Sequence, residues 1–372
     1  MKRRRAALLG LLAVVGAVAL WLRGVPARGD LGAIRLPRGF SIARFADSLP
    51  GARSLVLGAG GTVFVGARSG GAVYAVRDRD GDGTADSVYR IPGPFDAPTG
   101  VAFRDGALYV ADLARVWRLD MLEQRLATPP TPVLVTDGLP GEGWHGLRFA
   151  AFGPDGFLYV GSGAPCNVCL PEDERFGTIL QVDPKSGAVV LFARGVRNTV
   201  GFDWHPATGA LWFTDNGRDW LGEDEPPDEL NRAPRAGMHF GFPFCHGGVR
   251  PDPEFTARPC ADFAAPVVRL DAHVAALGMR FYTGGMFPAE YRGRIFIAEH
   301  GSWNRLVPVG YRITTADVAA SPPRYDVFAD GWLSRARRSA WGRPVDVLVM
   351  PDGALLVSDD HAGAVYRISY AP

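Results

Sequence analysis

The sequence predicts an all-β protein, a six-bladed β-propeller preceded by an N-terminal hydrophobic helix that acts as a signal or an anchor. Three observations support this prediction. A turn followed by a strand recurs six times, no sustained helical periodicity follows residue 30, and glycine and proline number 47 and 30 in 372 residues. Repeats of ~40–50 residues with several strands each are typical of propeller blades. We therefore expect a signal peptide or membrane anchor at residues 1–30 and one propeller domain at residues 31–372.

The repeat consists of a glycine turn and an apolar or alternating strand that ends in a small or acidic residue. Its turn glycines stand at positions 61, 106, 156, 209, 293 and 353, and the strands read TVFVG, ALYVAD, FLYVGS, ALWFTD, RIFIAE and ALLVSD. Asp-Gly and similar pairs between apolar runs indicate hairpins, because glycine tolerates a positive φ. The strand near residues 40–45 is expected to complete the last blade. A loop insertion is expected at roughly residues 215–275, which are rich in Pro, Gly, Asp and Glu.

The N-terminus has the pattern of an export segment. A basic cluster at residues 2–5 precedes an apolar, uncharged run at residues 6–22. The length of this run favours an uncleaved anchor over a cleaved signal. Because positive residues stay on the cytoplasmic side, we expect the propeller on the extracytoplasmic (periplasmic or cell-surface) side of the membrane.

The four cysteines fit an oxidising compartment. They stand at positions 166, 169, 245 and 260, and an even number in an exported protein suggests two disulfides. Proximity favours the pairs 166–169 and 245–260 among the three possible pairings. Leu170 follows the CNVC motif, which excludes a haem attachment site, and a structural staple is preferred to a redox or zinc pair.

Composition bears on which residue types are informative. The net charge of +1 gives no basic field for nucleic acid. Lys2 and Lys185 are the only lysines among 40 basic residues, so an arginine by itself is weak evidence of ligand binding. Asparagine is rare, and each copy is therefore better evidence of a local requirement. The asparagines are Asn167, Asn198, Asn216, Asn231 and Asn304.

Two motifs are candidates for chemistry at the channel of the propeller. His145 lies just before a predicted strand, where a neutral imidazole could take a hydroxyl proton near neutral pH. A histidine that only caps a strand is the alternative. Arg197 and Asn198 offer a positive charge and an amide to a carbonyl-rich planar ligand, or else form a turn with a solvated arginine.

Three further segments could bind ligands. The acidic, proline-stiffened segment 214–231 suits calcium or is a solvated loop. Trp303 and Trp341 could form stacking walls, and Arg305 and Arg343 could pair with carboxylates, although packing between blades is the commoner fate of tryptophan. The loop at residues 78–86 resembles the first half of an EF-hand loop without its final glutamate, and could bind calcium weakly or be a plain turn.

Taken in order, these motifs resemble the glucose/sorbosone dehydrogenase family, the sugar dehydrogenases that use pyrroloquinoline quinone (PQQ), and are most similar to its sorbosone-dehydrogenase-like branch. The likeness spans roughly residues 35–370. The motifs that support it are HGLR before FGPDG, GVRN before TVGFDWHP, TDN through PPDELN, HGSWNR, and WGRP before the final DG hairpin. Five motifs in the family's order on a six-unit repeat make the resemblance specific.

The resemblance implies oxidation of an aldose sugar or a sugar-like aldehyde by hydride transfer to PQQ, with one Ca²⁺ assisting. It implies catalytic roles for His145, as general base, and for Arg197. The implied cofactor-binding residues are Arg148, Asn198, Asn216, Trp303, Asn304, Arg305 and Arg343, and the implied calcium segment contains Glu223, Asp224 and Asp228. The implied partners are a small-molecule sugar or aldehyde and an external electron acceptor, with membrane contact only through the N-terminal segment.

The chain departs from glucose-type members at two places. Those members carry an aspartate after the strand that follows the base histidine, whereas this chain reads LYVGSGA and ends that stretch at Ala164. Val345 takes the place of a second arginine in the last cofactor motif. Two other readings remain open: a calcium-dependent lactonase or esterase that would use Asn198, Asp215 and Asp359, and a non-catalytic propeller that binds a partner.

Overall fold

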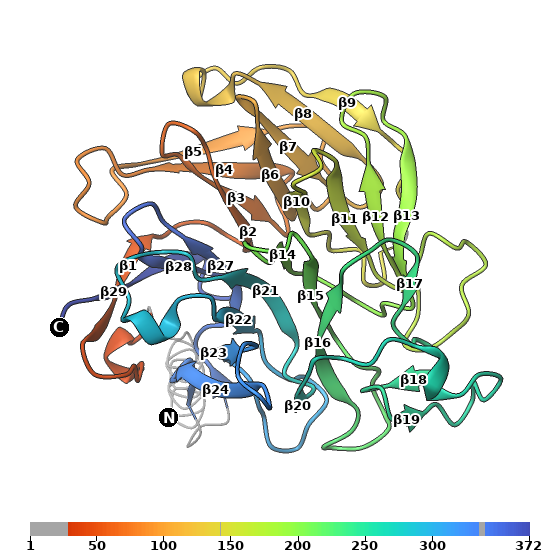
Figure 1. The fold of residues 1–372 in the computed structure, drawn as a ribbon. Coiled ribbons are helices and arrows are strands. Elements are labelled where there is room, and N and C mark those ends of the chain that lie inside the picture. The colour runs from red at the N-terminus through yellow and green to blue at the C-terminus, as the bar shows by residue number, and fades with distance from the viewer. Residues whose placement is uncertain (1–28, 142, 335–338) are drawn as a thin grey trace, which may run out of the picture.

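Six antiparallel sheets surround a common centre in the computed structural model, which describes residues 29–141, 143–334 and 339–372 (Figure 1). The first three sheets are β2 (Ala52–Leu57), β3 (Val63–Ala67), β4 (Ala72–Arg77) and β5 (Ser87–Pro92); β6 (Gly100–Arg104), β7 (Ala107–Ala111), β8 (Val116–Asp120) and β9 (Val133–Thr136); and β10 (Ala150–Phe152), β11 (Leu158–Ser162), β12 (Thr178–Val182) and β13 (Val189–Arg194). The fourth is β14 (Phe202–Trp204), β15 (Leu211–Asp215), β16 (Pro227–Ala233) and β20 (Val268–Ala272). The fifth is β21 (Ala276–Phe281), β22 (Ile295–Glu299), β23 (Arg312–Asp317) and β24 (Arg324–Ala329), and the sixth contains β27 (Pro344–Val349), β28 (Leu355–Asp359) and β29 (Ala364–Tyr370). The predicted six-bladed propeller is confirmed.

The N-terminal strand closes the ring. β1 (Phe40–Ala46) pairs antiparallel with β29, in a register that places Phe40 opposite Tyr370. The sixth blade thus combines strands from both ends of the chain, as predicted. β1 is the outermost strand of this blade, so the two ends of the chain are joined in one sheet and the ring is held closed.

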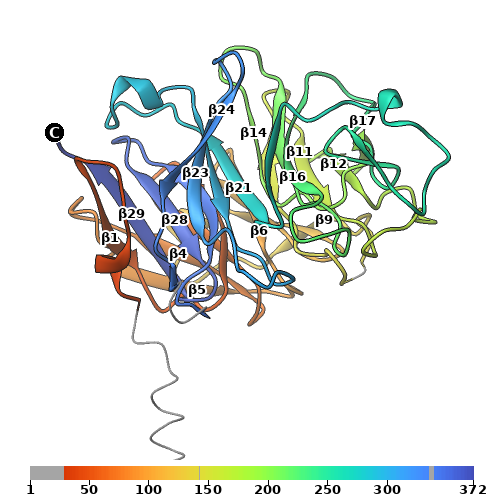
Figure 2. The ribbon, with the colours of Figure 1, turned by 90° about the horizontal axis from the view of Figure 1, so that it is seen from below.

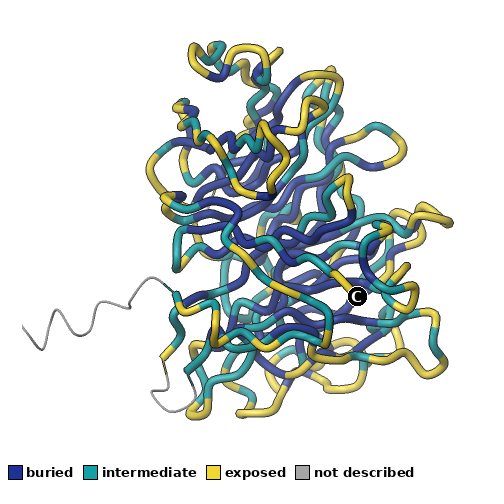
Figure 3. Tube along the Cα trace, turned by 90° about the vertical axis from the view of Figure 1, so that its left-hand side faces the viewer, coloured by how far each residue is buried: buried dark blue, intermediate teal, exposed yellow. Residues whose placement is uncertain are grey.

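The glycine-turn repeat forms the second strand of each blade. All residues of β3, β7, β11, β15, β22 and β28 are buried, because blades pack against both faces of these strands. Exposed residues gather in the connections, which Figure 3 shows in yellow around a dark-blue interior. The first strand of each blade lies nearest the centre, where β2 contacts both β6 and β27 (Figure 1).

The predicted loop insertion is wrong in part, because it contains the two outer strands of the fourth blade. β16 begins at Pro227 inside the acidic segment, and β20 returns antiparallel to it. The strand was hidden from pattern reading because Asp228 and Glu229 are buried, so its inward positions look polar. Between them, β17 (Met238–His239) pairs with β13, and β18 (Cys245–His246) pairs with β19 (Arg250–Pro251), so the segment packs beside the third blade (Figures 1 and 2).

No α-helix occurs among the described residues, which hold four short 3₁₀ turns: η1 (Leu31–Ala33), η2 (Leu122–Gln124), η3 (Cys260–Asp262) and η4 (Ala289–Tyr291). In addition, β25 (Leu333–Ser334) pairs antiparallel with β26 (Ser339–Ala340). In this part of the chain no helix is long and apolar enough to cross a membrane. The predicted N-terminal helix lies outside the described residues. Both predicted disulfides, Cys166–Cys169 and Cys245–Cys260, are present.

Candidate active site

A cavity of about 380 Å³ lies where the innermost strands begin. The loops that line it lead into β10, β14 and β21 or follow β3, β15 and β22, and β2 and β16 contribute one residue each. Its polar lining consists of Arg53, Arg68, His145, Arg197, Asn198, Asn216, Asp219, Asp228, His273, His300, Trp303 and Asn304. The cavity therefore joins side chains from motifs that are far apart in the sequence, and its volume is in the usual range for small-molecule sites.

His145 reaches the cavity from the loop before β10. The residue adopts a left-handed backbone conformation with φ of 47°, and its Nδ1–H donates to the carbonyl oxygen of Ala164 at 2.8 Å. A Cβ on Gly163 would lie 2.5 Å from the Cβ of His145, so the glycine makes room for the imidazole. Burial and, secondarily, the charge of Arg197 lower the His145 pKa to about 3. The imidazole is therefore neutral at physiological pH, and its Nε2 bonds to no described residue.

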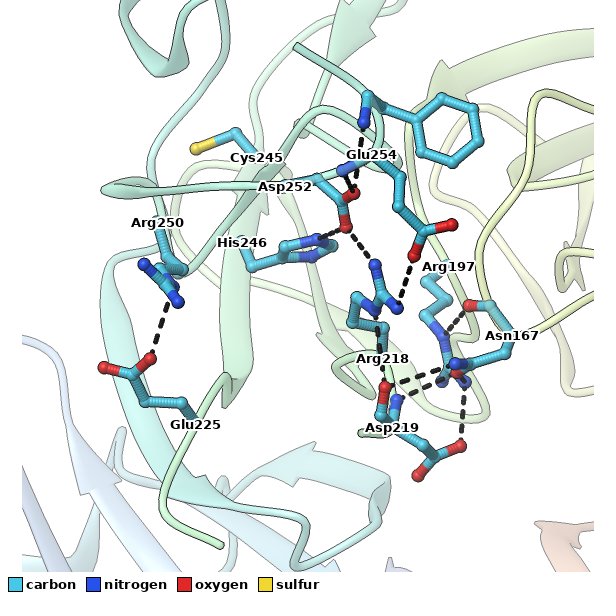
Figure 4. A network of polar contacts seen from close by, with 12 residues as sticks. Asn167, Arg197, Arg218, Asp219, Glu225, Cys245, His246, Arg250, Asp252 and Glu254 are labelled. Atoms are coloured by element: carbon cyan, nitrogen blue, oxygen red, sulfur yellow. Dashed lines mark hydrogen bonds and ion pairs between the residues drawn. The ribbon is translucent and has the colours of Figure 1, made fainter. Parts of the chain in front are cut away.

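Arg197 is held by Asn167, a residue of the loop closed by the Cys166–Cys169 disulfide, and Figure 4 shows the contacts between the two side chains. Its Nε donates to the carbonyl oxygen of Asn167 at 2.8 Å, and its Nη2 donates to the Asn167 Oδ1 at 2.9 Å. Nη2 also pairs with Asp219 at 3.3 Å, while Nη1 donates to the carbonyl oxygen of Asn216 at 3.1 Å. Because four of its five N–H groups have protein partners, Arg197 offers the cavity its positive charge and one N–H of Nη1.

The buried carboxylate of Asp215 holds the backbone of Arg197 and Asn198. Asp215 accepts hydrogen bonds from the backbone N–H groups of Arg197 at 2.9 Å and Asn198 at 2.7 Å. The side chain of Asn198 donates to Asn216 at 3.4 Å, and Asn216 in turn donates to the carbonyl oxygen of Ala276 at 2.6 Å. The two asparagine side chains thus form a connected amide edge of the cavity.

The HGSWNR motif contributes three residues to the cavity, namely His300, Trp303 and Asn304. Trp303 is 68% exposed and meets Trp220 edge to face at 5.4 Å between ring centroids. Asn304 donates through Nδ2 to Asp219 at 2.6 Å, and its buried Oδ1 has no hydrogen-bond partner among the described residues. Arg305 pairs with Asp224 at 2.7 Å and does not line the cavity.

Two other arginines expected at the cofactor lie outside the cavity. Arg148 is almost completely buried and donates to the backbone carbonyls of Leu113, Pro140 and Gly161, so it joins adjacent blades. Arg343 donates to the carbonyl oxygens of His300 and Gly301. Both guanidinium groups thus bond to backbone carbonyls of the scaffold, and neither lines the cavity.

Trp341 and Val345, on either side of Arg343 in the sequence, pack against other apolar residues. Trp341 stacks on Trp332 at 6.2 Å between centroids, which is packing within the sixth blade region. Val345, which takes the place of an arginine in glucose-type members, is buried in the core beneath the cavity.

The three carboxylates expected to bind calcium are not brought together. Asp228 lines the cavity, accepts from the backbone N–H groups of Gly217 and Ala276, and has its pKa raised to about 6 by burial. Glu223 and Asp224 are exposed and engage the N–H of Leu306 and the guanidinium of Arg305. Among the described residues, one trio of His, Cys, Asp or Glu side chains brings its ligand atoms within 4.8 Å, namely Asp78, Asp80 and Asp86 of the EF-hand-like loop.

Sequence reasoning missed four polar residues of the cavity. Arg53 lies on β2 and Arg68 just after β3, and nothing in the arginine-rich sequence marked them. His273 and His300 follow β20 and β22. The second histidine was within a motif already singled out, and the scarcity of histidine, with seven copies, was the available signal.

The residue set that a lactonase would need does not converge. Asn198 lines the cavity, but Asp215 and Asp359 do not. Asp359 accepts from the backbone N–H groups of Arg343, His361 and Ala362, so its oxygens are occupied by the protein. No observation of this structure favours the lactonase reading.

A family model described as glucose/sorbosone dehydrogenase matches residues 133–367, more than half of the chain. The chain belongs to the glucose/sorbosone dehydrogenase family. A relative from Borreliella burgdorferi, described as an uncharacterized protein, is 32% identical over 353 residues that cover 91% of each chain. The matched residues include all five motifs on which the sequence resemblance was based.

Solved structures of low sequence identity share the fold. The calcium structure of the carbohydrate-active enzyme family AA12 protein from Trichoderma reesei has a TM-score of 0.77 at 20% identity, covering 91% of this chain and 97% of that one. The holo form of the PQQ domain of pyranose dehydrogenase from Coprinopsis cinerea has a TM-score of 0.73 at 18% identity, covering 90% and 97%. At these identities the likeness establishes the propeller architecture alone.

Proposed function

We propose that this protein is an oxidoreductase that oxidises an aldose sugar or a sugar-like aldehyde by hydride transfer to PQQ. The observation that carries the proposal is the meeting of His145, Arg197 and Asn198, from two separate motifs, in one cavity at the propeller centre. Membership of the glucose/sorbosone dehydrogenase family and the PQQ domain of the Coprinopsis neighbour support it. The natural electron acceptor would be an external partner.

The cavity residues fit an anionic, polar cofactor. Arg53, Arg68 and Arg197 give the cavity a cationic side, which suits a ligand with several carboxylates. Two buried polar atoms beside it, Nε of Arg53 and Oδ1 of Asn304, lack hydrogen-bond partners among the described residues. We infer that Arg53, Arg68, Asn198, Asn216 and Asn304 hold PQQ, with Trp303 at the rim.

The residues of this chain would manage the proton and the charge. When bound, PQQ supplies the hydride-accepting chemistry. The Nδ1–H of His145 donates to the carbonyl oxygen of Ala164, so Nε2 of this neutral ring keeps its lone pair. Nε2 takes the hydroxyl proton of the substrate. The fixed positive charge of Arg197 stabilises negative charge that develops beside it, without reorganisation of the site.

Calcium enters the proposal through the likeness of fold to the Trichoderma protein. The expected side-chain set of Glu223, Asp224 and Asp228 does not assemble, and only Asp228 lines the cavity. The calcium structure of the Trichoderma neighbour supports a calcium requirement by likeness of fold. The PQQ titration with and without calcium tests this requirement.

An extracytoplasmic location remains part of the proposal. The two disulfides support it, because disulfides persist in oxidising compartments. The roles of residues 1–30 as a signal or anchor and of residues 31–372 as the enzyme domain are likewise proposed.

The test titrates metal-stripped protein with PQQ, with and without calcium, while the quinone absorbance is followed. Saturable binding, followed by reduction of an artificial electron acceptor that requires both PQQ and an aldose or aldehyde, is the expected result. Protein that is folded by circular dichroism but binds no PQQ, or that binds it and oxidises no sugar or aldehyde, would refute the proposal. His145→Ala is the matched variant, which should bind PQQ normally and lose turnover.

A further inference from the structure

Three histidines line the cavity, and they differ in which ring nitrogens are occupied. His273 lies with Nε2 2.9 and 3.0 Å from two backbone carbonyl oxygens, and its Nδ1 is 3.5 Å from the amide of Asn304. His145 uses only Nδ1, against a backbone carbonyl. His300 uses only Nε2, which lies 2.8 Å from Oδ1 of Asp360. His145 Nε2 and His300 Nδ1 therefore bond to no described residue and are available to a ligand.

His300 is held by a chain of side chains from three blades. It follows β22 of the fifth blade, Asp360 follows β28 of the sixth, and Arg53 lies on β2 of the first. The other Asp360 oxygen, Oδ2, pairs with Nη1 of Arg53 at 2.9 Å. The three side chains are 13%, 7% and 5% exposed, so little water competes for these contacts. The imidazole orientation is thus fixed by the closed ring itself.

The contact with Asp360 also fixes the tautomer of His300. An ionised carboxylate can only accept, so Nε2 carries the proton and Nδ1 presents a lone pair. Burial alone would raise the Asp360 pKa, but the hydrogen bond from His300 and the charge of Arg53 hold that pKa below its ordinary value. Burial lowers the His300 pKa to about 4, partly offset by Asp360. Near pH 7 the result is a neutral imidazole with one acceptor nitrogen.

We propose that Nδ1 of His300 accepts a hydrogen bond from a substrate hydroxyl other than the one that loses its proton to His145. This inference rests on the proposed function and adds a specificity-determining residue to it. A substrate that lacks this hydroxyl leaves a desolvated acceptor unpaired, which costs affinity and orientation. The site therefore selects polyhydroxylated substrates over deoxy analogues, and Asp360 and Arg53 act as positioning residues.

The activity test compares an oxidised aldose with its monodeoxy analogues. Wild-type holoenzyme should lose about 10–100-fold in kcat/KM for the analogue that lacks the recognised hydroxyl. In His300→Leu this discrimination should disappear, and in His300→Gln, which keeps an acceptor oxygen, it should partly return. His361→Leu is the matched control, because His361 is exposed and adjacent to Asp360. Unchanged discrimination in His300→Leu, or none in the wild type, overturns the inference.

A second measurement needs neither cofactor nor activity. Protein labelled with ¹⁵N-histidine should show His300 as the Nε2–H tautomer at neutral pH and His145 as the Nδ1–H tautomer. Asp360→Asn should shift the His300 signals and leave those of His145 unchanged. A His300 ring that carries its proton on Nδ1, or is charged at pH 7, overturns the inference. If the tautomers are as expected but no aldose or aldehyde is oxidised, the proposed function fails, and the selectivity inferred for it fails with it.

Discussion

The clamp on Arg197 gives the sharpest test of how this cavity is built. Asn167 stands inside the three-residue-separated disulfide Cys166–Cys169 and connects that loop to Arg197 and Asp219 (Figure 4). Its side chain accepts from Nη2 of Arg197 at 2.9 Å and from the backbone N–H of Asp219 at 2.8 Å, and donates to the carbonyl oxygen of Asp219 at 3.2 Å. Asn167→Ala removes all three bonds and leaves the disulfide in place.

The size of the effect follows from these bonds. A hydrogen bond between neutral groups contributes about 1 kcal/mol and one to a charged group about 1.5–3 kcal/mol. Water can replace part of this at the half-buried Asp219 backbone but less at the Arg197 side chain, which is 5% exposed. We expect Asn167→Ala to lower the free energy of unfolding by about 3 kcal/mol. At about 2 °C per kcal/mol for a chain of this size, Tm falls by about 6 °C.

Chemical denaturation with circular dichroism measures this change, with Leu170→Ala as the control. Leu170 lies just after the same disulfide and is 58% exposed, so its truncation should change the free energy of unfolding by less than about 0.5 kcal/mol. PQQ binding should weaken in Asn167→Ala, because the loosened guanidinium no longer holds a fixed charge at the cavity. Equal stability of the two variants would refute the claim that Asn167 holds Arg197.

Three further outcomes are expected. His145→Ala lowers turnover of the PQQ-loaded enzyme by roughly 10²–10⁴-fold with unchanged denaturation, and near-wild-type turnover contradicts the base assignment. Burial raises the Glu229 pKa to about 7 from 4.5, and burial and the charge of Glu229 raise the pKa of Asp215, so the wild type loses stability as pH rises above about 4.5. Glu229→Gln reduces this loss, so urea titration should find its stability relative to wild type greater at pH 8 than at pH 4. Replacing Cys245 and Cys260 by serine, which opens a loop with a sequence separation of 15, lowers the free energy of unfolding by about 3 kcal/mol, and a change below 1 kcal/mol contradicts this expectation.

The architecture could be predicted because its signal is local and repeated. Each glycine turn needs a positive φ, as Gly156 and Gly353 show at 89° and 90°, and each is followed by a strand buried from both sides. The closure by β1 followed from the need to pair the last sheet. The strand β16 could not be predicted, because its inward positions carry Asp228 and Glu229, whose burial depends on backbone donors from distant segments.

The cavity was predictable only in part, because the sequence does not show which arginines face it. His145, Arg197 and Asn198 stand in the loops before inner strands, so the repeat itself places them near the centre. The partner of a guanidinium, in contrast, is decided by three-dimensional neighbours. Arg148 satisfies backbone carbonyls between blades, whereas Arg53, with no motif around it, borders the cavity and orients Asp360.

Asparagine was the better guide because it is rare in this chain, with five copies at positions 167, 198, 216, 231 and 304, whereas arginine is abundant. Asn198, Asn216 and Asn304 line the cavity, and Asn167 holds its buried arginine, which leaves only Asn231 elsewhere in the fourth blade. An amide both donates and accepts without charge, so it can join a carboxylate, a guanidinium and a backbone carbonyl in a low-dielectric site where an added charge would be costly. Four of the five asparagines therefore lie at the cavity or in contact with the buried Arg197 beside it. The same logic explains His300, whose neutral ring can present an acceptor nitrogen only because Asp360 and Arg53 fix its proton on the other side.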